Sequence, residues 1–324
     1  MSSSVNIDKE EFSPLRKIFW PIYNVELKKF IPLLILYGFI CFNYHLLKAE
    51  KDTIIVTANS SGAAVIPFIK IWGILPMALL ITFIFTRLFN KFSLEKVFYI
   101  MTGSFLLFFT IFGFVLFPMR DSIHPHTLCN TLGNLLPSGL QGFVEVFRHW
   151  SFTLFYVMSE LWGTAIMSVL FWAFANEIMT VKDAQRFYGI LGVGANISAI
   201  IAGKIAVVIS EKMFDLSSIF GKDTWTQSLG LITSVVTVTG LISMVLFRMY
   251  ILNVVGPTQS NGLNKTNKPP AKKEKMGLRK NFSFLLKSKY LICIAILVIG
   301  FNLSVNMVEI IWKDQIKLAY PDPN

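Results

Sequence analysis

The sequence has 324 residues, of which 54% are hydrophobic and 15% charged, and its formal net charge is +11. Soluble globular proteins carry about 25% charged residues, so this composition excludes an ordinary soluble domain. Apolar runs of about eighteen residues or more recur along the chain, and a helix of that length crosses about 30 Å of hydrocarbon. The composition therefore predicts an all-α membrane protein, a multi-pass helical bundle.

Seven runs of low charge are predicted to span the membrane as helices. In chain order they cover about residues 29–47, 63–85, 97–117, 150–172, 187–209, 228–250 and 289–308. The residues before the first run lack the apolar core and small-residue cleavage site of a signal peptide. The three cysteines are odd in number and far apart, which indicates neither a disulfide framework nor a metal knuckle.

The positive charge of the chain is explained by membrane topology. Lys and Arg gather in the N-terminal tail, in the loops at 86–96 and 176–188, and above all at 248–289. Cytoplasmic segments of membrane proteins are enriched in these residues. We therefore expect the N-terminal tail and the 251–288 linker to be cytoplasmic. We also expect the protein to lie in the lipid bilayer of the cell inner membrane and to bind no nucleic acid.

The basic linker divides the chain into unequal parts. We predict a cytoplasmic tail at 1–28, a six-helix transmembrane bundle at 29–250, the linker at 251–288, and the first helix of a second bundle at 289–324. Transporters built as two six-helix halves joined by a cytoplasmic loop have this layout.

Three ionisable residues stand inside predicted spans. Lys70 is flanked by Pro67 and Pro76, each of which removes a backbone donor and opens the helix. Glu160 and Glu309 are the other two. A charge at mid-bilayer costs at least about 2.5 to 3.5 kcal/mol, and it usually lines a polar path. The bland alternatives are snorkelling to the interface, the end of a span, or a structural ion pair.

Further polar residues extend this candidate path. Asn302, Asn306, Glu309 and Lys313 are spaced four, three and four apart, which puts them on one face of the last helix. Lys51 belongs to a basic cluster after the first span. Such a cluster either steers charged substrate toward the entrance of the path or is an ordinary ring of basic residues at the membrane interface. Asn196 lies on a face of small residues that otherwise indicates close helix packing.

Motifs for an enzyme are missing from the sequence. It has no phosphate-binding GxxxxGK[ST], no HExxH and no GxSxG. The HPH string at 124–126 has no third ligand of the usual spacing, so we expect no metal site and no cofactor. A channel would need a symmetric ring or a filter loop, and the two-half layout favours alternating access instead.

Several strings in this sequence resemble the ATP/ADP translocase family of nucleotide transporters, found in obligate intracellular bacteria and in plastids. One of them is "IPFIKIWGILPMA", and the most specific are "WSFTLFYVMSELWGTAIMSVLFWAFANEI" and "SVNMVEIIWKDQIK". The resemblance implies twelve helices in a major-facilitator-like architecture, and exchange of ATP for ADP plus phosphate in most members. It also implies functional roles for Lys70, Glu160 and Glu309.

A basic residue that family members carry in their second half has no counterpart, because the sequence stops at "AYPDPN". We expect a second bundle to be required. The alternatives are a proton-coupled importer of other nucleotides and a truncated, non-transporting remnant. For a transporter, we expect Lys70 to bind phosphate and to pair with Glu160 when the site is empty. Tyr156 and Trp162 either stack on adenine or pack in the membrane.

Overall fold

The structure is a computed structural model that describes residues 13, 16, 20–58, 63–211, 223–255 and 288–319. Its regular elements in these ranges are all helices. Seven helical stretches are long and apolar enough to cross a membrane. The prediction of an all-α multi-pass protein is confirmed, while most of the predicted tail and linker lie outside the described residues.

The spans are longer than the apolar runs that predicted them. They are Asn24–Thr57, Ile66–Lys91, Leu94–Leu116, Trp150–Ile178, Val181–Glu211, Thr224–Val255 and Lys289–Ala319. The first span differs most, because the helix continues past residue 47 through Lys48 and Lys51. A helix is held together by its backbone hydrogen bonds, which charged side chains do not interrupt. Charged residues can therefore continue a membrane helix where they form ion pairs inside the bundle.

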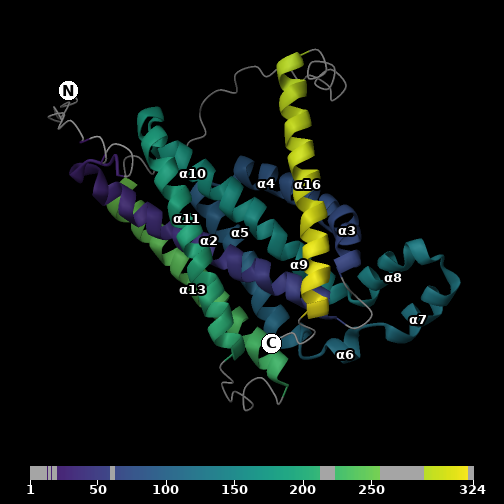
Figure 1. The fold of residues 1–324 in the computed structure, drawn as a ribbon. Helices are drawn as coiled ribbons and strands as arrows, with labels where there is room; N and C mark the ends of the chain where they lie inside the picture. The colour runs from purple at the N-terminus through teal and green to yellow at the C-terminus, as the bar shows by residue number, and fades with distance from the viewer. Residues whose placement is uncertain are drawn as a thin grey trace.

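Several spans combine more than one helical element. The main helices are α2 (Leu27–Thr57), α3 (Ile66–Phe68), α4 (Leu75–Lys91), α5 (Leu94–Ile111), α9 (Trp150–Trp162), α10 (Phe171–Ile178), α11 (Val181–Glu211), α13 (Thr224–Tyr250) and α16 (Lys289–Ala319). The π-helical stretches are η3 (Ile69–Ile74), η4 (Phe112–Leu116), η6 (Gly163–Leu170) and η7 (Ile251–Val255). Three short helices, α6 (Arg120–Ile123), α7 (His126–Leu135) and α8 (Gln141–Arg148), lie beside one end of the bundle (Figure 1).

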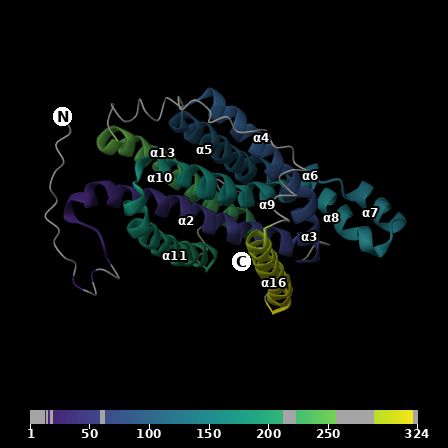
Figure 2. The same ribbon diagram turned by 90° about the horizontal axis from the view of Figure 1, so that it is seen from above.

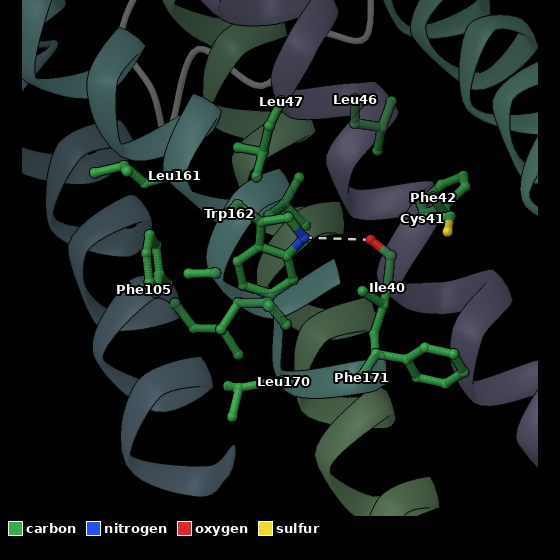
Figure 3. Packing of buried hydrophobic residues seen from close by; sticks show 14 of the residues in the cluster. Ile40, Cys41, Phe42, Leu46, Leu47, Phe105, Leu161, Trp162, Leu170 and Phe171 are labelled. Carbon is green, nitrogen blue, oxygen red and sulfur yellow. Dashed lines mark hydrogen bonds between the residues drawn. The ribbon is translucent and has the colours of Figure 1, made fainter. Parts of the chain in front are cut away.

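Helix α2 is the centre of the bundle, because α9, α11 and α13 all pack against it (Figures 1 and 2). Trp162 of α9 is fully buried, and its indole Nε1 donates a hydrogen bond to the carbonyl of Ile40 at 3.2 Å (Figure 3). The edge of this indole meets the Phe105 ring at a centroid distance of 5.9 Å. Aromatic packing of this kind fixes the position of α9 relative to α2.

One end of the bundle gathers basic residues, and we call it the basic end. It is the end at which α2 begins. Arg186, near the start of α11, pairs with Glu26 just before α2 at 2.6 Å. Arg248, near the end of α13, pairs with Glu95 at the start of α5. The opposite end, where α2 finishes, is called the far end.

Helix α16 passes in front of the other spans in Figure 1, and Figure 2 shows that it lies on the outside of the bundle that they form. It meets the end of α2 and the turn at Ala63–Val65. Its apolar side chains are mostly exposed, and Lys313 is the only buried residue among those described in this helix. Ile310 is half-buried and packs against the core. The contact between α16 and the bundle is therefore small and centred on a charged side chain.

Candidate functional site

Six ionised side chains from four helical elements meet toward the far end of the bundle, and we call them the charge network. They are Lys51, Asp52, Lys70, Glu160, Glu309 and Lys313. Three are cations and three are carboxylates, so their formal charges cancel. A balanced set is the arrangement that lets charged groups exist within a membrane bundle.

Lys51 is the most deeply buried member, with 2% of its side chain exposed. Its Nζ lies 2.9 Å from Asp52 Oδ1 and 3.3 Å from Glu160 Oε2. The same ammonium stands 3.9 Å from the centroid of the Tyr156 ring. Two carboxylates and an aromatic face together replace the hydration that this cation loses on burial.

Lys70 lies on the π-helical stretch η3, between Pro67 and Pro76. Its Nζ lies 3.1 Å from Glu309 Oε2 and donates a second hydrogen bond to the amide oxygen of Asn306. Both partners belong to α16. Lys70 therefore links the second span to the seventh.

Lys313 completes the network from α16, with 5% of its side chain exposed. Its Nζ lies 2.8 Å from Asp52 Oδ1 and 2.8 Å from Glu309 Oε1. Glu309 therefore bridges Lys70 and Lys313, and Asp52 bridges Lys51 and Lys313. The result is one continuous chain of ion pairs from Lys70 to Glu160.

Exchange of partners is the chemistry that this network allows. Each lysine holds carboxylate oxygens at hydrogen-bonding or ion-pair distance, and phosphate oxygens are the same kind of charge-assisted acceptor. The side chains of Lys70, Glu160 and Glu309 are 24%, 31% and 21% exposed in the described part of the chain. Phosphate oxygens are therefore chemically able to replace the carboxylates as acceptors for these lysines.

The structure brings together Asn306, Glu309 and Lys313, which the helical spacing placed on one face, and it adds Lys70 to them. Glu160 is different, because it pairs with Lys51 and not with Lys70. The cause is the length of α2. Its continuation to Thr57 carries Lys51 into the bundle beside α9 and leaves Lys70 to α16.

The basic cluster predicted after the first span is corrected in the same way. Lys51 belongs neither to a mouth nor to an interfacial collar, because it is buried within α2. Its neighbour Asp52 was not among the residues predicted for the site. The only signal for it in the sequence is its adjacency to Lys51.

The two candidate aromatic residues, Tyr156 and Trp162, are both 0% exposed. Trp162 packs in the core, and the Tyr156 ring lies under Lys51, so neither face is open to a ligand in this arrangement. Asn196 and Asn302 are exposed, and each donates a hydrogen bond to a carbonyl of its own helix. Neither amide touches the charge network.

Three histidines meet at the far end, although the sequence indicated only the pair at 124–126. The rings of His124, His126 and His149 lie 5.2 to 5.9 Å apart between centroids. They line a cavity of about 220 Å³. Burial, together with the neighbouring His149 and His126, lowers the pKa of His124 to about 4. Among the described residues, no group of three His, Cys, Asp or Glu is arranged to hold a metal ion.

A polytopic helical bundle with paired intramembrane charges on facing helices is an arrangement typical of membrane transport proteins. Comparison with known families specifies the class further. Residues 5–324 match the model of the TLC ATP/ADP transporter family, and the chain belongs to that family. The family resemblance is confirmed.

Similar proteins are found in bacteria and in plants. The chain is 39% identical over 318 residues to ADP,ATP carrier protein 1 of Chlamydia pneumoniae, covering 98% of this chain and 61% of that protein. It is 40% identical over 306 residues to the chloroplastic ADP,ATP carrier protein 1 of Arabidopsis thaliana, covering 94% and 48%. No solved structure matches the chain. The chain thus spans about three-fifths or less of the length of these relatives.

Proposed function

We propose that this chain takes part in exchanging ATP for ADP across a membrane by alternating access. The charge network carries the proposal, because its six members come from helices on both sides of the linker and cancel one another when no ligand is present. The names of the relatives support the choice of nucleotides. A nucleotide di- or triphosphate brings about three or four negative charges, and lysines are the complementary groups.

The lysines and carboxylates have separate roles in this proposal. Lys70, Lys51 and Lys313 bind phosphate oxygens, and Glu160 and Glu309 take the lysines back when the nucleotide leaves. A site of lysines alone would hold the anion too tightly to release it, so the carboxylates set an affinity that allows turnover. The original expectation of a Lys70–Glu160 pair is replaced by two pairs, Lys70 with Glu309 and Lys51 with Glu160.

We also propose that the basic end faces the cytoplasm of a bacterial cell and that the protein lies in the inner membrane. The proposal is supported by the Lys and Arg residues that surround the starts and ends of helices at this end. A cysteine introduced at Asn264 in the linker is then protected from membrane-impermeant maleimide in intact cells. Labelling from outside would refute this orientation.

A second bundle is a further part of the proposal. The relatives are longer than the matched region, and the apolar side chains of α16 are mostly exposed in the described part of the chain. We propose that a second set of helices packs on α16 and is needed for transport. Inorganic phosphate is proposed as a third substrate, since it presents the same oxygens as the nucleotide phosphates.

The test is counter-exchange in proteoliposomes loaded with ADP, with labelled ATP outside. The protein should include all coding sequence that continues the reading frame, and Lys70→Gln serves as the matched variant. We expect ATP uptake that depends on internal ADP, and a raised apparent KM in Lys70→Gln. Uptake that is insensitive to internal ADP but abolished by a proton uncoupler would replace exchange with proton-coupled import.

A further inference from the structure

Asp52 contacts two lysines of the charge network through one carboxylate oxygen. Its Oδ1 atom lies 2.9 Å from the Nζ of Lys51, on the same helix, and 2.8 Å from the Nζ of Lys313, on α16. Its side chain is 17% exposed, whereas the two lysines are 2% and 5% exposed. One carboxylate oxygen therefore holds two nearly buried cations that belong to different parts of the chain.

This contact is one of the few that attach α16 to the bundle in the described structure. Lys313 is the only buried residue among those described in α16, and the apolar side chains around it are mostly exposed. Glu309, the other partner of Lys313, belongs to α16 and moves with it. The Lys313–Asp52 pair is therefore one of two ion pairs, with Lys70–Glu309, that join α16 to the first bundle in the described structure.

We propose that Asp52 is a positioning residue that latches α16 to the bundle through Lys313, and that phosphate groups open the latch by replacing Asp52 on the lysines. The inference rests on the proposed function for its ligand but concerns the movement of α16. It adds to the site a residue that touches no substrate and acts through two lysines that do.

The spacing of the lysines supports the replacement step. Because both Nζ atoms contact the same oxygen, at 2.9 and 2.8 Å, they are at most 5.7 Å apart. A single phosphate group presents several oxygens and can accept hydrogen bonds from two ammonium groups at that separation. Lys51 and Lys313 can therefore pass from Asp52 to phosphate together, which frees α16 from α2.

The experiment follows the separation of α16 with a cysteine at Ile310, which packs half-buried against the core beside the latch. Labelling of Ile310→Cys by a small maleimide is measured in the otherwise cysteine-free protein, with and without ATP. We compare Asp52→Asn, Lys313→Gln and the control Asp314→Asn, which removes an exposed carboxylate from the position next to Lys313. Melting temperatures confirm that each variant is folded.

In the parent protein we expect slow labelling that ATP accelerates. Asp52→Asn and Lys313→Gln should each raise the rate without ATP by about tenfold, the lower bound for losing one hydrogen bond to a charged group. The double variant should resemble either single one, because both remove the same contact. Asp314→Asn should behave like the parent.

Two results would overturn the latch: parental labelling rates in folded Asp52→Asn and Lys313→Gln, or additive effects in the double variant. Failure of the proposed function has a different signature. If nucleotides do not act on the protein, ATP changes no labelling rate and exchanges no ADP, while Asp52→Asn still labels faster than its control. If ATP exchanges but does not accelerate labelling, the replacement of Asp52 by phosphate is wrong.

Discussion

Replacing Lys51 by Met removes the most deeply buried cation of the charge network and keeps a side chain of similar length. The change leaves Glu160 without its Lys51 partner, while Asp52 keeps Lys313. It also removes the ammonium that stands over the Tyr156 ring. Lys48→Met is the matched control, because Lys48 is an exposed lysine one turn earlier on the same helix.

The expected cost follows from burial and from the remaining partners. Removing one member of a buried ion pair typically costs about 3 to 5 kcal/mol, because the other charge stays behind uncompensated. Glu160 is 31% exposed, so water can hydrate part of its charge. We therefore expect Lys51→Met to lower the free energy of unfolding by about 3 kcal/mol, at the lower end of that range.

A double-mutant cycle with Glu160→Gln tests the reasoning. Removing the stranded carboxylate as well should restore part of the lost stability, so the double variant should be more stable than Lys51→Met alone. Denaturant unfolding of the purified protein in detergent gives the four free energies. Counter-exchange on the same samples separates folding from function. A cost below about 1 kcal/mol for Lys51→Met, the value typical of exposed pairs, would refute the assignment of Lys51 as a buried charge anchor, and so would strictly additive effects.

Three further predictions concern packing and pH. A Cβ atom on Gly163 would lie 2.5 Å from the Tyr44 ring, so Gly163→Ala should destabilise the protein by about 1 to 3 kcal/mol. Gly203→Ala is its control, because a Cβ atom there meets nothing within 4 Å. Adding Tyr44→Ala to Gly163→Ala should remove the steric clash and restore part of the lost melting temperature. Trp162→Phe removes the indole hydrogen bond to the Ile40 carbonyl, which keeps its backbone partner within α2, and should cost about 0.5 to 1.5 kcal/mol in the same assay. The lowered pKa of His124, about 4, means that the unfolded chain binds a proton first as the pH falls. Stability from this group should therefore be full above about pH 6.5 and be lost between pH 6.5 and 4. In His124→Gln, the melting temperature should depend less on pH between about pH 6.5 and 4. An unchanged pH dependence would contradict the lowered pKa of His124.

The sequence by itself determined the class of the protein and much of its candidate site. The hydropathy and length of an apolar run are local properties, so the positions of seven spans could be predicted from the sequence alone. The cost of a charge in hydrocarbon is also local, and it identified Lys70, Glu160 and Glu309 before any contact was known. The prolines around Lys70 predicted an opened helix, whereas the structure has a continuous π-helical stretch there. Helical spacing placed Glu309 and Lys313 on a common face.

Only the tertiary structure decided which charges meet. Lys70 and Glu309 are 239 residues apart in the sequence, and no periodicity relates positions on different helices. The length of α2 was equally hidden, because a hydropathy window ends where charges begin, whereas a helix continues wherever its backbone hydrogen bonds do. The sequence therefore placed Lys51 in a basic cluster after the first span and assigned no role to Asp52. In the folded chain, Glu160 of α9 pairs with Lys51 and Lys313 of α16 pairs with Asp52. These ion pairs offset the desolvation cost of burying the two charges inside the bundle.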